Sequence, residues 1–139
     1  MITKGVAKYV YLDSTEKFNG EDTGKYTLTI GLNPSEAKKL EDAGVKVRTI
    51  TDKDTGKEIK IRKFSTQYKL DDDMIQTVSG EAIGTDFGAG SDVSILWKAG
   101  NEHPTHGVAT YLTAIKVADD HEPGYKGANE EIADFLTTA

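Results

Sequence analysis

The stretch GKYTLTIGLNPSEAKKLEDAG, residues 24–44, joins the two kinds of element on which the fold depends. Residues 26–30 alternate apolar or aromatic side chains with threonine, which is typical of a half-buried strand. Asn33 is a good N-cap, Pro34 suits a first helical position and Gly44 ends the apolar pattern, so a helix is expected directly after this strand. Its apolar stripe is narrow, and we therefore expect the helix to pack on the outside of a β structure.

Period-two alternation continues on both sides of this stretch. It predicts further strands at residues 6–12, 45–49, 58–70, 93–97 and 108–117. Polar, glycine-containing turns join these strands into two hairpins, one over residues 45–70 and one over residues 93–117. Residues 70–78 fit either a strand or one helical turn, and the pattern leaves that choice open.

This order of elements predicts a mainly β protein. We expect a small five-stranded OB-fold-type barrel with one inserted helix, while a β-sandwich is the alternative. After Val117 the alternation stops and acidic residues accumulate, so the domain is expected to span residues 1–118. Residues 119–139 then form an acidic C-terminal segment, in which residues 130–136 have the pattern of a short helix.

The charge is distributed unevenly along the 139 residues. The chain has 17 Lys plus Arg and 23 Asp plus Glu, a net charge of -6 that by itself argues against binding a polyanion. However, residues 1–70 have 14 basic and 10 acidic side chains, whereas residues 71–139 have 3 and 13. Such asymmetry between halves is typical of a polyanion-binding surface beside an acidic segment.

The first hairpin concentrates the positive charge. Residues 45–69 contain eight basic and three acidic side chains, a net charge of +5. Strict alternation places Lys60, Arg62, Phe64 and Tyr68 on one face of its second strand. Cations that track phosphates beside rings that stack on bases are what single-stranded nucleic acid requires. The alternative is a bulge after Lys63, which would turn Phe64 and Tyr68 inward.

Other aromatic and basic residues extend this candidate site. Lys46 and Arg48 lie on the first strand of the basic hairpin, and Tyr9 and Tyr11 share the less apolar face of the first strand. Trp97 continues the apolar face of the strand over residues 93–97, so a core position is favoured for it.

Catalytic and metal-binding patterns are weak. The chain has no cysteine, which removes disulfides, thiolate nucleophiles and cysteine-based zinc sites. His103 and His106 lack both the helical spacing of a metalloprotease and a third ligand. The acidic run at residues 71–73 lacks the alternating ligands of a calcium loop, and the glycines at residues 84–90 lead into a strand instead of a helix. We therefore expect no enzyme activity, no cofactor and no metal.

Five stretches resemble the phage single-stranded DNA-binding proteins of the podovirus type, an OB-fold replication family. They are GVAKYVYL at residues 5–12, GKYTLTI at 24–30, IKIRKFSTQY at 59–68, GAGSDVSI at 88–95 and GVATYLTAIKV at 107–117. Each stretch is a loose match, and their order, with a helix after the second strand, is the more specific signal. Together they cover most of residues 5–118.

The resemblance implies sequence-independent coating of single-stranded DNA during phage replication and recombination. It implicates Lys60, Arg62, Phe64 and Tyr68, and less directly Tyr9, Tyr11 and Trp97. It also implies contacts with replication proteins through an acidic C-terminal segment, although residues 119–139 are shorter and less acidic than such tails and have Phe135 near, not at, the end.

The expected location is the cytoplasm of the infected host, because the N-terminus has no apolar signal region and no stretch is long enough to cross a membrane. The oligomeric state stays open, with a homodimer as one option. The alternative function is a phage structural or adaptor β-domain that binds an acidic protein partner.

Overall fold

The computed structural model describes residues 1–18, 20–51, 56–84, 87–105 and 107–119. The longer elements are β1 (Ile2–Tyr11), β4 (Tyr26–Leu32), α1 (Pro34–Asp42), β6 (Glu58–Thr66), β8 (Asp92–His103) and β9 (Gly107–Val117). The shorter ones are β2 (Lys17–Phe18), β3 (Glu21–Asp22), β5 (Arg48–Thr51), the 3₁₀ turn η1 (Asp72–Met74) and β7 (Ile75–Thr77).

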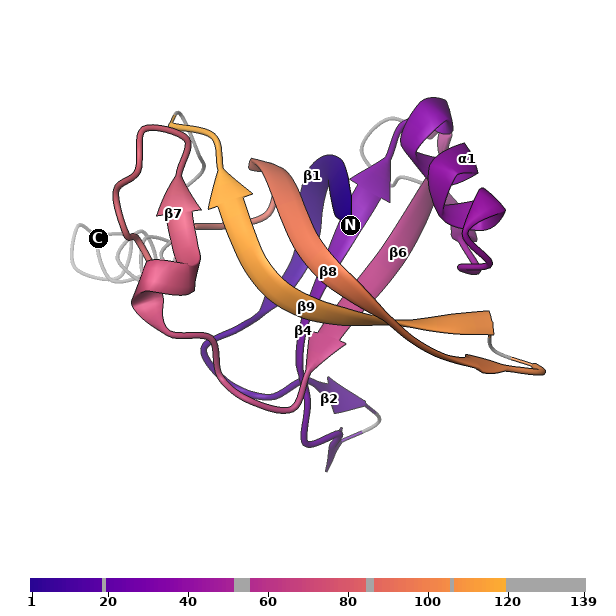
Figure 1. Cartoon of the computed structure of the whole chain (residues 1–139), viewed down its shortest axis with the longest axis horizontal. Coiled ribbons are helices and arrows are strands. Elements are labelled where there is room, and N and C mark those ends of the chain that lie inside the picture. Colours follow the sequence, from indigo (N-terminus) through magenta and orange to yellow (C-terminus); the bar gives the residue numbers. More distant parts are fainter. Residues whose placement is uncertain (19, 52–55, 85–86, 106, 120–139) are drawn as a thin grey trace, which may run out of the picture.

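Five strands close into a ring (Figure 1). Antiparallel pairs join β6 to β4, β4 to β1, β1 to β8 and β8 to β9. The ring closes where β9 meets β6 in parallel at Ser65 and Tyr111. Strand β5 lies beside β6, and β7 lies beside β9. This single continuous sheet confirms the mainly β, five-stranded OB-type fold and replaces the sandwich alternative.

Helix α1 follows β4 as the sequence predicts. The Asn33 side chain accepts a hydrogen bond from the Glu36 amide at 2.8 Å, which caps the first turn. Ala37 and Leu40 are buried against the ring, and Gly44, which follows the C-cap Ala43, has a φ of +85° that favours glycine. The tip of the β8–β9 hairpin reaches this end of the helix, where the Val108 amide donates to the Gly44 carbonyl at 3.0 Å.

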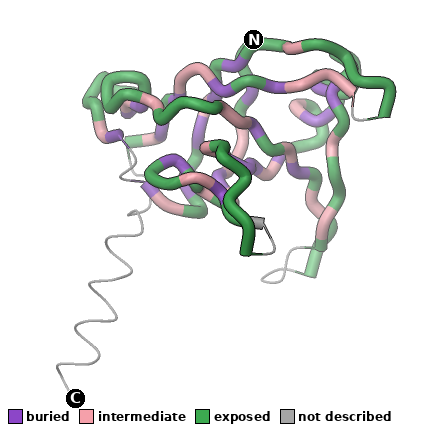
Figure 2. The backbone as a smooth tube through the Cα atoms, turned by 90° about the horizontal axis from the view of Figure 1, so that it is seen from below, coloured by how far each residue is buried: buried purple, intermediate pink, exposed green. Residues whose placement is uncertain are grey.

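Buried positions recur along the strands of the ring (Figure 2), and their side chains form the core. Its largest members are Phe64 of β6 and Trp97 of β8, whose ring centroids are 5.9 Å apart at an interplanar angle of 53°. The indole N–H of Trp97 donates to the Thr3 hydroxyl at 2.8 Å, so the buried donor is satisfied. Leu28 of β4 is opposite Phe64 in the sheet and is buried beside it.

The inward position of Phe64 corrects the sequence-based assignment of the β6 faces. Alternation does hold along β6, because its pairing with β4 has no register shift. Residues opposite each other in adjacent strands point to the same side of a sheet, so buried Leu28 and Ile30 place Phe64 and Arg62 on the inner side. The bulge weighed as the alternative is absent from this described pairing, and Tyr68 does not turn inward with Phe64, being 79% exposed.

Strand β1 contains a bulge that strict alternation does not predict. Its pairing with β4 shifts between Ala7 and Tyr9, which leaves Lys8 as the extra residue. Ala7 is consequently buried on the same side as Leu12, although the sequence pattern places them on opposite faces. Tyr9 and Tyr11 share the outer face, as expected.

Other sequence-based boundaries are also refined. Residues 70–78 contain both alternatives in succession, because η1 is followed directly by β7. The β8 strand continues to His103, so the turn between β8 and β9 is shorter than the expected segment 100–107. Most of the predicted acidic segment, with its short helix, lies outside the described residues.

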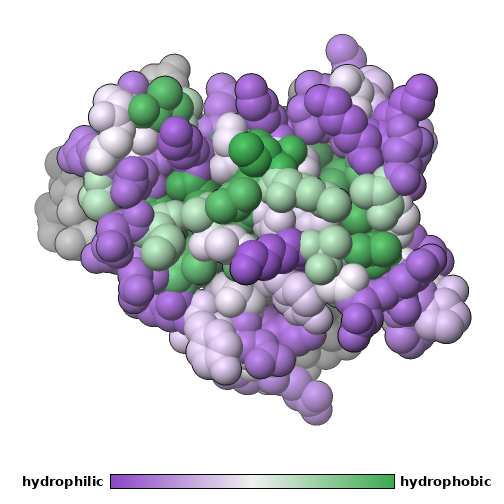
Figure 3. All heavy atoms as spheres, viewed as in Figure 1, coloured by the Kyte–Doolittle hydropathy of each residue, from purple (hydrophilic) through white to green (hydrophobic). Residues whose placement is uncertain are grey.

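An apolar band crosses the face on which β8 and β9 lie, bordered by hydrophilic side chains (Figure 3). Ile2 is 66% exposed, and it pairs in the sheet with Leu96, which is 42% exposed. Ile2, Leu96 and Met74 all line one shallow depression on this face. This face is therefore chemically distinct from the basic part of the molecule.

The buried position of Phe64 yields a stability prediction. We expect Phe64→Ala to lower the free energy of unfolding by about 3–5 kcal/mol, because it removes a fully buried ring and its contact with Trp97. Urea denaturation followed by Trp97 fluorescence measures this loss. A loss below about 1 kcal/mol would contradict the core assignment.

Candidate nucleic-acid interface

A groove of about 460 Å³ lies on the outer side of the ring, over β1, β4, β6 and β5. Its lining combines two tyrosines, five basic side chains and one acidic side chain. These residues, with two others on the floor, are Tyr9, Tyr11, Glu16, Lys17, Thr29, Lys46, Arg48, Ile61, Arg62 and Lys63. The groove thus brings together Tyr9, Tyr11, Lys46, Arg48 and Arg62 of the predicted site residues.

Sheet register explains how the groove is built. Tyr9 of β1 lies opposite Thr29 of β4, which lies opposite Lys63 of β6, so all three point to the outer side. Tyr9 is 52% exposed, whereas Thr29 is buried beneath the surface. A rigid strand therefore presents an accessible ring above a floor of small side chains.

The neighbouring rows complete the surface. Tyr11, which is 36% exposed, lies opposite Thr27, and Ile61 of β6 lies opposite Arg48 of β5. No hydrogen bond or ion pair to the Arg48 guanidinium occurs within the part of the chain that the structure describes. Arg48 is exposed, so its guanidinium is available to an anion.

Arg62 is occupied by the protein itself. Its Nε and Nη2 donate to the Thr110 hydroxyl at 3.1 and 3.0 Å, its Nη1 donates to the Lys46 carbonyl at 3.0 Å, and Nη2 also reaches the Val108 carbonyl at 3.5 Å. Burial lowers the pKa of Arg62 below its usual value, but an arginine remains protonated at neutral pH. Arg62 therefore joins β6 to β9 and to the segment before β5.

Two other predicted cations also have protein partners. The Lys46 ammonium donates to the Thr105 carbonyl at the β8–β9 turn, although its side chain lines the groove. Lys60 points to the inner side with Arg62 and forms an ion pair with Glu41 of α1 at 3.3 Å. Lys60 does not line the groove.

The aromatic predictions divide in two. Phe64 and Trp97 are 0% and 1% exposed, so neither offers a face for stacking, and their assignment as DNA contacts is wrong for this structure. Tyr68 is accessible but does not line the groove. Tyr9 and Tyr11 are the predicted aromatic residues that the groove contains.

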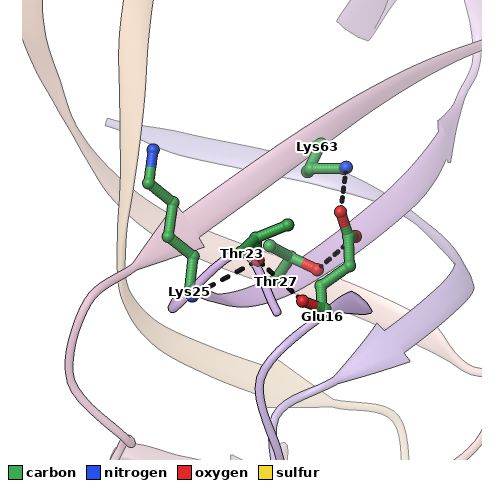
Figure 4. Close-up of polar contacts among 5 residues, drawn as sticks. All are labelled: Glu16, Thr23, Lys25, Thr27 and Lys63. Carbon is green, nitrogen blue, oxygen red and sulfur yellow. Dashed lines mark hydrogen bonds and ion pairs between the residues drawn. The ribbon is translucent and has the colours of Figure 1, made fainter. Parts of the chain in front are cut away.

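Sequence reasoning missed three residues that line the groove: Lys17, Lys63 and Glu16, which is paired with Lys63. Figure 4 shows the Glu16 carboxylate between β4 and β6, where it contacts Thr27 and Lys63. The sequence does contain a signal for Lys63. When β4 and β6 are aligned, Leu28 lies opposite Phe64, so both side chains point inward and Lys63, the neighbour of Phe64, points outward. No comparable pattern identifies Glu16, which lies in an irregular loop.

A further exposed tyrosine, Tyr111, continues the outer surface beyond Ser65. Tyr111 of β9 lies opposite both Ser65 and Lys98, and it is 51% exposed. A Cβ on Gly100 would lie 2.3 Å from Cε2 of the Tyr111 ring, so glycine at this position lets the ring lie against the backbone. One side of the ring is thereby supported by the protein.

The described residues contain no group of three or more His, Asp or Glu side chains able to hold a metal ion. His103 is described and its Nδ1 accepts from the Thr105 amide at 3.1 Å, whereas His106 lies outside the described residues. Among the helices described, none is long and apolar enough to cross a membrane.

The contacts of Arg62 yield a second prediction. Arg62→Met removes donors to two carbonyls and one hydroxyl, so we expect the free energy of unfolding to fall by about 1–3 kcal/mol. Urea denaturation measures the change, and Lys38→Met on the exposed side of α1 is the matched control. Equal stability of the two variants would show that Arg62 does not hold β6 and β9 together.

The sequence matches no protein-family model and no curated protein. Among solved structures, the C-terminal truncation of the single-stranded DNA-binding protein from bacteriophage Enc34 matches with a TM-score of 0.55 and 15% identity, over 87% of this chain and 86% of that one. The same Enc34 protein in complex with single-stranded DNA matches with a TM-score of 0.53 and 14% identity, over 86% and 84% of the two chains. The chain therefore has the fold of this phage single-stranded DNA-binding protein.

Proposed function

We propose that the protein binds single-stranded DNA without sequence specificity, in the groove over β1, β4 and β6. The observation that carries the proposal is the pair of accessible rings, Tyr9 and Tyr11, in a groove with five basic side chains and one acidic side chain. Stacking requires unpaired bases, so this combination favours single strands over duplexes.

The groove supplies contacts for both parts of a nucleotide. Bases stack on Tyr9 and Tyr11, while phosphates contact Arg48 and Lys17 at the edges. Few polar groups on the floor are free to read base edges, because Thr27 and Thr29 are almost fully buried. Binding by stacking and charge is expected to tolerate any sequence. The Enc34 protein of the same fold, which is solved with single-stranded DNA, supports this proposal.

The wider role follows from the same proposal. A protein that coats single strands acts where duplexes are opened, so we place this one in phage DNA replication and recombination in the host cytoplasm. We assign it no catalytic activity of its own. The acidic residues of 119–139 are proposed to contact replication proteins, and the oligomeric state, including a homodimer, is part of what solution measurements must determine.

The direct test is titration of a labelled oligo-dT at several salt concentrations. Each phosphate contact contributes about -0.7 to the log–log salt slope, so three or four contacts give a slope of roughly -2 to -3. We expect weaker binding to the matching duplex. Equal affinity for duplex and single strand would favour the alternative of a phage structural or adaptor domain that binds an acidic protein partner, or a generic polyanion binder. No affinity for oligo-dT would overturn the proposal.

Two substitutions separate stacking from charge. Tyr9→Ala is expected to weaken binding by about 1–3 kcal/mol with little change in slope, and Tyr9→Phe should retain most of the affinity. Arg48→Gln is expected to weaken binding to every sequence and flatten the slope by about 0.7. Lys38→Gln, which removes a charge from the exposed side of α1, is the control. The same slope change in Lys38→Gln and Arg48→Gln would show that the groove is not the site.

A further inference from the structure

Glu16 is the one acidic side chain among the described residues that line the groove. Its side chain is only 11% exposed, and both carboxylate oxygens have partners. Oε2 accepts from the Thr27 hydroxyl at 2.9 Å, and Oε1 accepts from the Lys63 ammonium at 2.5 Å (Figure 4). Thr27 and Lys63 belong to neighbouring strands, so the carboxylate lies on the groove floor between β4 and β6.

The backbone of Glu16 is held as firmly as its side chain. Its amide donates to the Lys25 carbonyl at 2.8 Å, and its carbonyl accepts from the Thr23 amide at 2.9 Å and the Thr23 hydroxyl at 2.8 Å. These bonds join Glu16 to residues 23–25, the segment that leads into β4. The carboxylate is therefore a fixed part of the groove, in contrast to a mobile surface acid.

The ion pair with Glu16 neutralises Lys63. Lys63 lies in line with Thr29 and Tyr9, where a bound strand would place a phosphate beside a stacked base. In the free protein its ammonium already has a carboxylate partner. A phosphate can reach Lys63 only in competition with that carboxylate.

We propose that Glu16 is an internal competitor for Lys63 that sets the affinity of the groove for the phosphates of single-stranded DNA. The inference rests on the proposed function and adds an affinity-determining residue to the same site. When a phosphate replaces the carboxylate, one anion is exchanged for another, and the contact adds little to the net release of counterions. A free lysine would add about 0.7 to the magnitude of the salt slope.

The structure supplies a matched control. Glu41 and Lys60 form another Glu–Lys pair, 3.3 Å apart, with both side chains 47% exposed. Neither residue lines the groove. Glu16→Gln and Glu41→Gln therefore remove the same charge, but only the first removes it from the groove. A glutamine at position 16 still offers an oxygen to the Thr27 hydroxyl.

The experiment measures binding of labelled oligo-dT to the full chain over a series of salt concentrations. Compared with Glu41→Gln, we expect Glu16→Gln to bind about three- to tenfold more tightly at low salt, with a slope steeper by about 0.7. Adding Lys63→Gln to Glu16→Gln should abolish that gain. Identical affinity and slope in Glu16→Gln and Glu41→Gln would overturn the inference, as would a gain that survives the loss of Lys63.

A separate comparison remains decisive if Glu16→Gln does not fold, which thermal denaturation reports. In the otherwise unchanged chain, Lys63→Gln should flatten the salt slope less than Arg48→Gln does, because Lys63 releases fewer counterions. Equal flattening by the two substitutions would overturn the inference. Failure of the unchanged chain to bind oligo-dT would instead overturn the proposed function, so the two failures are distinguishable.

Discussion

The packing of Phe64 against Trp97 across the ring is the contact on which the rest of the molecule depends. It links β6 to β8, two strands that do not pair with each other, and it assigns one side of β6 to the interior. Because side chains alternate along a strand, the same contact directs Ile61 and Lys63 to the outside. The chemistry of the groove is therefore a consequence of how the core is filled.

Most basic side chains of the groove already have partners within the protein, and only some are available to a ligand. The groove has five basic side chains, but Arg62 holds strands together, Lys46 contacts a turn and Lys63 is paired with Glu16. A count of cations along the chain therefore overstates what a ligand meets. A protein with a net charge of -6 can still present a basic surface because its basic side chains are concentrated in residues 1–70, which have 14 basic and 10 acidic side chains.

The fold was predictable from the sequence to a greater extent than the site. Alternation located the ring strands, and the capping residue Asn33 with Pro34 located the helix, because these signals are local. The inner face of β6 was assigned wrongly, since Phe64 beside Arg62 resembles an exposed basic and aromatic strip until Leu28 is aligned with it. Glu16 was inaccessible to such reasoning because its partners are 11 and 47 residues away along the chain.

The extra residue at Lys8 has a consequence for how this strand tolerates change in length. It separates β1 into a first part that pairs with β8 and a second part that carries Tyr9 and Tyr11. Odd-numbered side chains point inward in the first part and even-numbered side chains point inward in the second. The number of residues between the two parts therefore matters as much as their identity. Deletion of Lys8 would remove the bulge and leave Tyr9 and Tyr11 on the outer side, whereas an unbulged strand of the present length would exchange the tyrosines with Val10 and Leu12. The extra residue thus lets one strand bury Ala7 and still expose its tyrosines.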